Sequence, residues 1–348
     1  MPELTSSSVE TELNRLLAAG RLRASDYGEH YVALWDAFAR SSSGGKRMRP
    51  ALVLAAYSGL GGDDLELVTP VAVSFELLHT AFIIHDDVID RDLTRRGMAN
   101  VSGEFSSRAM RNGASLDQAE VWAVTAGILA GDLALSEAHR AIALLPADAD
   151  TRGRLLDLLD RSVFISAAGE LADVTNTTPT RPVAIEQVLT TLECKTAIYS
   201  FESPLQAGAI LAGATPETLE ALGQFGRLIG VAFQLTDDIL GVFGDPETTG
   251  KSALSDLREG KQTALMACAS TTSAWPAIAS HLGSADAGEE EAALVRAHLR
   301  ACGALQAVQT LTKDYASRAL DALDSPHIPD ALRVTLTELA DSAADRHR

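Results

Sequence analysis

Long runs rich in alanine and leucine alternate with short polar segments along the whole chain. This pattern predicts helices rather than strands, because Ala and Leu are among the best helix formers. The main predicted helices are Tyr27–Ala39, Ala51–Leu60, Leu65–Asp90, Val121–Leu144, Leu155–Ala172 and Ala221–Val242. Further helices are expected around Lys195 and after Thr263. The chain is therefore predicted to be all-α.

The predicted helices are not divided by any linker rich in Pro, Gly or Ser, so we expect a single domain over residues 21–348. Residues 1–20 are polar apart from a short amphipathic pattern at Leu13, Leu16 and Leu17. We expect them to form a loosely ordered N-terminal segment.

The composition supports a globular protein with a large core, since 46% of the 348 residues are hydrophobic and 5% are aromatic. The longest apolar run, Val71–Ile84, is interrupted by Glu76 and His79, so no transmembrane helix is expected. The net charge of -18 argues against binding to nucleic acid or to anionic lipid.

Three cysteines, Cys194, Cys268 and Cys302, lack the spacing of metal ligands and are odd in number, which favours reduced structural thiols. No signal peptide is recognised at the start of the chain, so a cytoplasmic location is expected.

An acidic cluster closes the apolar helix that ends near residue 90. Asp86 and Asp90 are four residues apart, which places both carboxylates on one helix face, and Asp87 lies beside them. Hard oxygen ligands with room for water and phosphate suit Mg²⁺. Taken alone, a solvated helix end explains the cluster equally well.

A second acidic pair, Asp237 and Asp238, closes the apolar run that contains Phe233 and Gln234. If the two clusters face each other, metal ions between them can clamp a diphosphate. A basic stretch, GGKRMRP at Gly44–Pro50, precedes a helix N-terminus and is predicted to bind an anion. The alternative for this stretch is a basic surface loop.

The placement of lysines adds to this picture. Only five lysines occur, and four of them, Lys46, Lys195, Lys251 and Lys261, lie in short motifs with glycine or threonine; the fifth is Lys313. A codon bias toward arginine would explain the scarcity of lysine but not its placement.

Together these motifs resemble the trans-isoprenyl diphosphate synthases, or polyprenyl synthetases, from about Gly44 to Thr263. The resemblance implies an isoprenoid synthase helical bundle around a central cavity, a Mg²⁺ cofactor and a homodimer. It also implies two substrates, isopentenyl diphosphate and an allylic diphosphate. The residues implied to hold metal are Asp86, Asp87, Asp90, Asp237 and Asp238.

The same resemblance assigns the substrate-binding side chains. Those implied to contact isopentenyl diphosphate are Lys46, Arg49, His79 and Arg96, and those implied to contact the allylic diphosphate are Arg95 and Lys195. Lys251 and Lys261 belong to a glycine-bearing loop that can close over a diphosphate. Lys195, Thr196 and Gln234 are implied to act at the reacting carbons. For Thr196, a hydroxyl bonded back to its own helix is an equally good interpretation.

Two positions depart from the pattern of the family. The chain has Glu170 where relatives commonly have Gln, and this adds negative charge near the metal site. The second motif ends in Gly241 where many relatives have Asp. Both departures put the metal affinity in doubt.

Product length is expected to depend on side chains below the first acids. In the family an aromatic residue five positions before the acids accompanies short products, and here that position is Ala81. Phe82 and Leu78 are then expected to form the floor, meaning the closed end of the cavity that holds the growing chain. This favours geranylgeranyl diphosphate (C20), with farnesyl and longer products as alternatives.

Other readings remain open but fit less well. A terpene cyclase should lack GGKRMRP, a non-catalytic partner subunit usually loses one Asp motif, and an acidic scaffold protein would leave the lysine placement unexplained.

Overall fold

The structure is a computed structural model that describes residues 2–177, 182–244, 255–284 and 287–344. These residues are almost entirely helical, and the strands among them are a two-residue antiparallel pair, β1 (Thr94–Arg95) and β2 (Met98–Ala99). The predicted all-α class is confirmed. The chain divides into two compact units, residues 1–159 with 207–213, and residues 160–206 with 214–348. The single-domain assignment stays a prediction.

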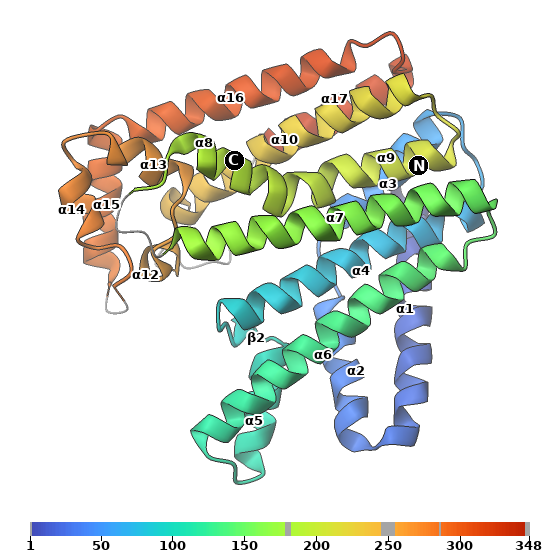
Figure 1. Ribbon diagram of the computed structural model, residues 1–348, viewed down its shortest axis with the longest axis horizontal. Helices are drawn as coiled ribbons and strands as arrows, with labels where there is room; N and C mark the ends of the chain where they lie inside the picture. The colour runs from blue at the N-terminus through green and yellow to red at the C-terminus, as the bar shows by residue number, and fades with distance from the viewer. Residues whose placement is uncertain (1, 178–181, 245–254, 285–286, 345–348) are drawn as a thin grey trace. The chain divides into compact units, whose positions relative to one another are not determined.

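Unit 1 is built on a long central helix and the helices around it (Figure 1). Its helices are α1 (Pro2–Ala24), the short 3₁₀ helix η1 (Ser25–Tyr27), α2 (Glu29–Ser41), α3 (Met48–Gly59), α4 (Leu65–Ile89), α5 (Val101–Arg111), α6 (Leu116–Ala143) and the first part of α7 (Ala149–Asn176).

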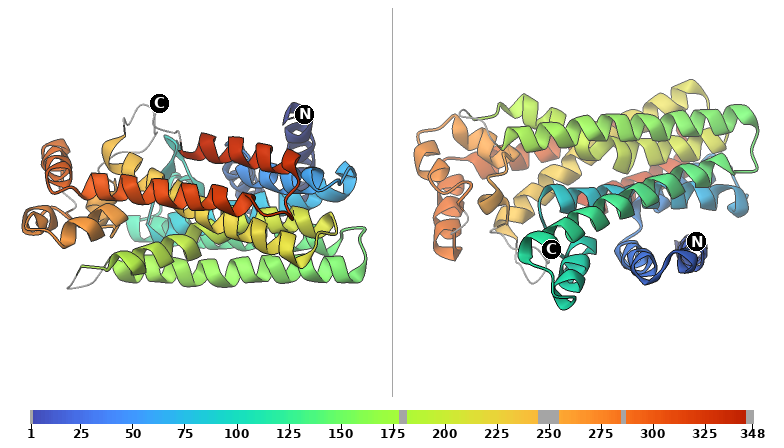
Figure 2. Two further views of the ribbon diagram at one scale, coloured as in Figure 1. Left: turned by 90° about the horizontal axis from the view of Figure 1, so that it is seen from above. Right: turned by 60° about the horizontal axis from the view of Figure 1, so that its bottom comes forward.

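Unit 2 contains the rest of α7 and the C-terminal helices. These are α8 (Ile185–Leu192), the π-helix η2 (Glu193–Glu202), the start of α9 (Ser203–Leu211), α10 (Pro216–Phe243), α12 (Ser255–Glu259), α13 (Ala264–Ser270), α14 (Trp275–Ala279), α15 (Glu289–Ala301), α16 (Ala304–Leu323) and α17 (Asp330–Ala344). Helices α10 and α16 lie side by side (Figure 2). Leu235 and Ile239 of α10 belong to the same buried cluster as Val308 of α16.

The helix α4 matches its prediction within one residue and is the core of unit 1. Asp64 caps its start, since the carboxylate accepts a hydrogen bond of 3.0 Å from the amide of Leu67. It packs along α6, where Ser74 Oγ donates to the carbonyl of Ala138 at 2.9 Å. The face of α6 in this contact is made of small buried residues, Ala126, Gly127, Ala130, Gly131, Ala134 and Ala138.

The leading helix α1 is better packed than the sequence suggested. Val9, Leu13 and Leu17 are all buried, and α1 contacts α4. Residues three and four apart on a helix share one face, so these side chains form the stripe that docks α1 in unit 1.

Two helices, α4 and α6, are long and apolar enough to cross a membrane by length and composition alone, which makes them weak candidates. In α4, 72% of the apolar window is buried inside the protein, as expected of a core helix, and in α6 the share is 39%. The sequence-based expectation of no transmembrane helix stays a prediction.

Candidate active site

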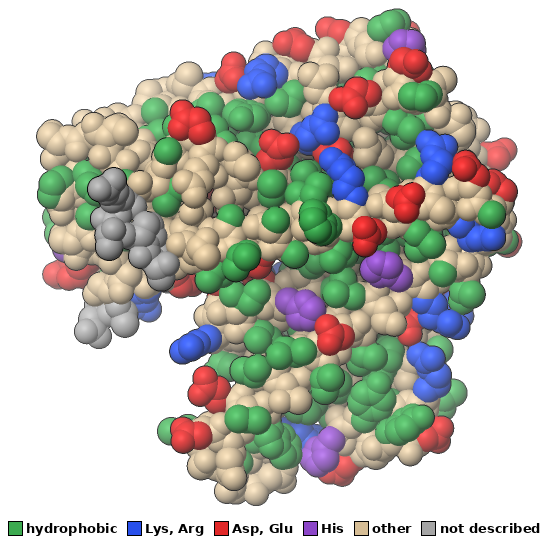
Figure 3. All heavy atoms as spheres, in the orientation of Figure 1, with side chains coloured by type: hydrophobic (Ala, Val, Ile, Leu, Met, Phe, Trp, Pro, Cys, Tyr) green, Lys and Arg blue, Asp and Glu red, His purple; other side chains and the backbone are tan. Residues whose placement is uncertain are grey.

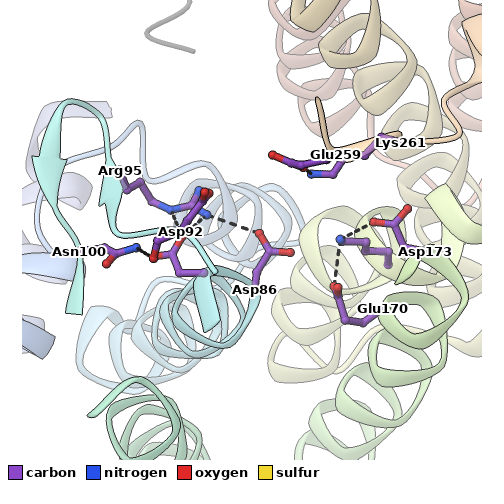
Figure 4. Close-up of polar contacts among 10 residues, drawn as sticks. Asp86, Asp92, Arg95, Asn100, Glu170, Asp173, Glu259 and Lys261 are labelled. Carbon is purple, nitrogen blue, oxygen red and sulfur yellow. Dashed lines mark hydrogen bonds and ion pairs between the residues drawn. The ribbon is translucent and has the colours of Figure 1, made fainter. Parts of the chain in front are cut away.

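The first acidic cluster is asymmetric. Arg95 Nη2 lies 2.6 Å from Asp87 Oδ1 and 3.4 Å from Asp86 Oδ2, and Arg95 Nε also donates to Asp87 at 2.8 Å (Figure 4). The side chain of Asp87 is 4% exposed, whereas that of Asp86 is 28% exposed. Asp87 is therefore the anchor of Arg95, while Asp86 lies further from Arg95 and is the more exposed of the two acids.

The environment of Asp87 changes its protonation. Burial raises the pKa of Asp87 to about 6, even though the hydrogen bonds and the charge of Arg95 act to lower it. At neutral pH the carboxylate is mostly ionised and paired with Arg95. It suits a supporting role better than direct metal binding.

The β1–β2 hairpin places Arg95 and Arg96. Its two turn residues, Arg96 and Gly97, have φ of 54° and 74°, as a two-residue hairpin turn requires. The guanidinium of Arg96 lies over the glycine pair of the GGKRMRP loop, 3.6 Å from the point that a Cβ at Gly45 would occupy. The hairpin and this loop, distant in sequence, therefore meet in unit 1.

A partly buried histidine lies near several basic residues in unit 1. Burial lowers the pKa of His79 well below its usual value, and the charges of Arg49, Arg95, Arg96 and Arg47 lower it further. His79 is therefore neutral at pH 7 and is suited to donate or accept a hydrogen bond. The structure thus brings together the four predicted unit 1 residues Arg49, His79, Arg95 and Arg96.

Two neighbouring basic side chains of the GGKRMRP loop differ in their exposure. Lys46 is exposed, whereas Arg47 is buried and paired with Glu10 and Glu76. The sequence grouped Arg47 with Lys46 and Arg49 in one anion site, and this part of the grouping is wrong because both sides of the Arg47 guanidinium are taken by carboxylates.

In unit 2 the key lysine lies between two acids. Lys195 Nζ is 2.7 Å from Asp173 Oδ2 and 3.0 Å from Glu170 Oε2 (Figure 4). Sequence reasoning noted Glu170 as a departure from the family but did not anticipate that it contacts this lysine. The formal charges of Lys195, Glu170 and Asp173 add up to -1.

Lys195 and Thr196 lie in the π-helix η2, a rare geometry that is often found at functional sites. Gly169 of α7 makes this placement possible, because a Cβ there would lie 2.3 Å from the amide nitrogen of Lys195. The Gly169-Glu170 and Lys195-Thr196 motifs are therefore in direct backbone contact.

The second acidic pair is also asymmetric. Gln234 Nε2 donates to Asp238 Oδ1 at 3.1 Å, one helical turn along α10, and Asp238 is buried. Asp237 is only half-buried. As in the first cluster, one acid is held by a neighbour and the other is more accessible.

Two further lysines were predicted to bind diphosphate. Lys261 Nζ lies 2.8 Å from Glu259 Oε2 (Figure 4). Lys251 lies outside the described residues.

The acids fit a metal that binds through few protein ligands. Within the described parts of the chain, no group of three or more His, Cys, Asp or Glu side chains is arranged to hold a metal on its own. Mg²⁺ is usually bound by one or two carboxylates together with water and substrate phosphates. Asp86 and Asp90, one turn apart, offer that kind of partial site.

Comparison with known proteins agrees with the motifs. The sequence pattern of the family described as polyprenyl synthetase matches residues 34–298. The chain is 34% identical over 310 residues to a (2E,6E)-farnesyl diphosphate synthase of Mycobacterium tuberculosis, covering 87% of this chain and 80% of that one. It is 31% identical to an octaprenyl diphosphate synthase of Escherichia coli, covering 88% of both.

A solved structure has the same fold. The geranylgeranyl pyrophosphate synthase of Corynebacterium glutamicum, complexed with isoprenyl diphosphate and magnesium, matches with a TM-score of 0.90 and 33% identity over 97% of both chains. The fold is therefore the isoprenyl synthase helical fold. The chain belongs to the polyprenyl synthetase family and is a trans-prenyltransferase.

Proposed function

We propose that the protein joins isopentenyl diphosphate to an allylic diphosphate, with Mg²⁺, and releases geranylgeranyl diphosphate (C20). The observation that supports the prenyl-transfer chemistry is that Arg49, Arg95 and Arg96 lie near the neutral His79, with Arg95 also 3.4 Å from the partly exposed carboxylate of Asp86. The alternatives are a farnesyl or longer-chain synthase and a non-catalytic subunit of a heteromeric synthase.

The proposed roles follow the two units. In unit 1, Lys46, Arg49, His79 and Arg96 bind the diphosphate of isopentenyl diphosphate, and Arg95 binds the allylic diphosphate. In unit 2, the allylic diphosphate is held by Lys195 and Lys261 together with Lys251. Arginine suits this task because its fork grips phosphate oxygens in pairs.

The acids proposed to hold Mg²⁺ are Asp86, Asp90 and Asp237, with Asp87 and Asp238 in support. When bound, Mg²⁺ stabilises the negative charge that develops on the leaving diphosphate. Asp87 orients Arg95 by two hydrogen bonds, and Gln234 fixes Asp238 by one.

The reaction proposed for the substrates is head-to-tail transfer. The allylic C–O bond ionises, the double bond of isopentenyl diphosphate attacks the allylic cation, and a proton leaves to the released diphosphate. Thr196, beside Lys195, is proposed to turn its hydroxyl oxygen toward the cation. Lys195 and Arg95 are proposed to hold the leaving group.

The proposed product length rests on three side chains of α4. Phe82 lies four residues before Asp86, on nearly the same helix face, and Leu78 lies one turn further from the acids. Ala81 is fully buried and shares the helix face of Ser74 and His85, both of which contact α6. We infer that Phe82 and Leu78 form the floor, while Ala81 leaves space toward the small residues of α6.

The test is an incubation of the purified protein with Mg²⁺, labelled isopentenyl diphosphate and each of dimethylallyl, geranyl and farnesyl diphosphate. Chromatography then sizes the products. A discrete C20 product supports the proposal, and C15 or C30 and longer products replace it with another chain length. Absence of product with every primer favours the non-catalytic subunit.

We also propose a cytoplasmic homodimer. The three cysteines within the described residues are free thiols, which suits a reducing compartment. Helix α6 exposes large apolar side chains, Leu116, Val121, Val124, Ile128 and Leu129, and Figure 3 shows apolar side chains over this part of unit 1. Such a face fits a second copy of the chain.

The dimer is tested by the double substitution Val121→Glu and Ile128→Glu. Size-exclusion chromatography with light scattering then measures the molecular mass of the variant and of wild type. A dimer that becomes a monomer supports the assignment of this face. A wild-type protein that elutes as a monomer contradicts it.

A further inference from the structure

Arg47 has an unusual backbone and an unusual environment. It directly precedes α3 and has a φ of 49°, in the left-handed region that non-glycine residues rarely occupy. Its neighbour Lys46 is exposed, but the side chain of Arg47 is only 7% exposed. The loop therefore directs the Arg47 side chain into the protein, whereas the neighbouring Lys46 side chain lies at the surface.

Two carboxylates from two helices hold the Arg47 guanidinium. Arg47 Nη1 donates to Glu76 Oε1 of α4 at 2.6 Å. Arg47 Nε and Nη2 donate to the two oxygens of Glu10, with Nη2 at 3.1 Å from Oε2. The contact with Glu10 is the bidentate arrangement in which arginine binds carboxylate most strongly.

The two acids differ in setting. Glu76 is buried, and its Oε2 has no hydrogen-bond partner within the described residues. The side chain of Glu10 is 40% exposed and comes from α1, which is docked by Val9 and Leu13 on either side of it. Glu10 therefore connects a separately anchored helix to the loop.

This connection stabilises a conformation that the loop would not prefer. A left-handed conformation is unfavourable for arginine, and Gly44 and Gly45 with φ of 71° and 87° add backbone freedom that must be lost. The paired guanidinium offsets both costs, because the side chain of Arg47 is fixed at each end of its fork.

We propose that Glu10 is a positioning residue for the isopentenyl diphosphate site, acting through Arg47 to fix the loop that carries Lys46 and Arg49. The proposal rests on the proposed function for the identity of the ligand. It assigns to α1 a role that the motifs of the chain do not indicate, since Glu10 lies 37 residues before Arg47.

The test compares Glu10→Ala with Glu12→Ala in the full-length protein. Glu12 is a matched control, because it lies on the same helix and pairs only with its neighbour Arg15, at 2.7 Å, among the described residues. We expect Glu10→Ala to raise the KM for isopentenyl diphosphate by about fivefold to twentyfold. The kcat and the KM for the allylic diphosphate should stay within about twofold, since a hydrogen bond that only places one substrate affects neither.

Two further variants examine the route through Arg47. Glu10→Asp keeps a carboxylate and should recover most of the affinity. Adding Glu10→Ala to Arg47→Lys should cost little more than Arg47→Lys alone, since the bidentate contact with Glu10 is already lost in the single variant. Additive effects would overturn the proposed route through Arg47.

Hydrogen exchange of residues 44–49 separates this inference from the proposed function. In Glu10→Ala, but not in Glu12→Ala, these amides should exchange faster, whether or not the protein makes a prenyl product. Unchanged exchange together with an unchanged KM overturns the positioning role. If the wild-type protein makes no prenyl product but Glu10→Ala still speeds exchange of these amides, isopentenyl diphosphate is ruled out as the ligand of the loop. The structural link between α1 and the loop is then retained.

Discussion

Glu170 Oε2 and Lys195 Nζ form an ion pair of 3.0 Å in unit 2. Asp173 contacts the same ammonium at 2.7 Å, so the lysine is already held by two carboxylates. A diphosphate that binds Lys195 must compete with both.

We expect Glu170→Gln to lower the KM for the allylic diphosphate by about twofold to tenfold, because the amide keeps a hydrogen bond but removes a competing charge. The KM for isopentenyl diphosphate should stay the same. Asp160→Asn, an exposed acid on the same helix, is the control. An equal or higher KM in Glu170→Gln would contradict the competition.

The stability of the protein should depend on pH through Asp87. Burial raises the pKa of Asp87 from 3.8 to about 6 in the folded protein, so the folded state binds this proton more tightly than the unfolded chain. The contribution of Asp87 to the free energy of unfolding therefore falls as pH rises from about 4 to about 6.

We expect the free energy of unfolding of wild type, relative to that of Asp87→Asn, to fall by about 2–3 kcal/mol between pH 4 and pH 7. The change reports the titration of Asp87, because asparagine does not titrate. Urea unfolding with chelator present measures this difference. Asp63→Asn, at an exposed acid, is the control variant. A flat difference for Asp87→Asn would argue against the raised pKa.

Phe82→Ala should lengthen the product. The ring lies on the helix face of Asp86, and its removal opens the proposed floor by the volume of an aromatic side chain. We expect products at least one isoprene unit longer than those of wild type, sized by chromatography. Phe164→Ala removes an equal ring at a position that is 77% exposed and should leave the product unchanged. An unaltered product from Phe82→Ala would move the floor elsewhere.

Two glycines of α7 should respond in opposite ways to alanine. A Cβ at Gly169 would lie 2.3 Å from the backbone of Lys195, whereas a Cβ at Gly153 would have no atom within 4 Å. We expect Gly169→Ala to destabilise the protein by about 2–4 kcal/mol, because backbone must move. Gly153→Ala should stabilise it by about 0.5–1 kcal/mol. Similar unfolding midpoints for the two variants would rule out the close contact.

The long helices were predictable because local signals define them. The apolar run from Leu65 predicted α4 to within one residue of its observed end at Ile89. The predicted helix Ala221–Val242 lies within α10, whose start is moved earlier by the cap at Thr215. Helix α5 was missed, since it is short and its Asn100 cap is a weak signal.

The details of the site depend on contacts that no local pattern reveals. The π-helix η2 forms where Gly169, in another helix, allows backbone to approach. The direction of Arg47 depends on Glu10 and Glu76, which are 37 and 29 residues away. Residue type suggested the members of the proposed site, and packing decided which of its acids are buried against a partner and which are more exposed.

Arg95, Lys195 and Lys261 each have a carboxylate within 2.6–2.8 Å. If the proposed function holds, a diphosphate that binds to any one of them exchanges one anionic partner for another, so few mobile counterions are released to the solvent. Its affinity should therefore vary little with ionic strength, unlike that of a bare cationic surface. Because the whole protein carries a net charge of -18, long-range electrostatic attraction should not draw this proposed substrate to the protein. Its capture should depend instead on the replacement of a carboxylate by a phosphate at each cationic side chain.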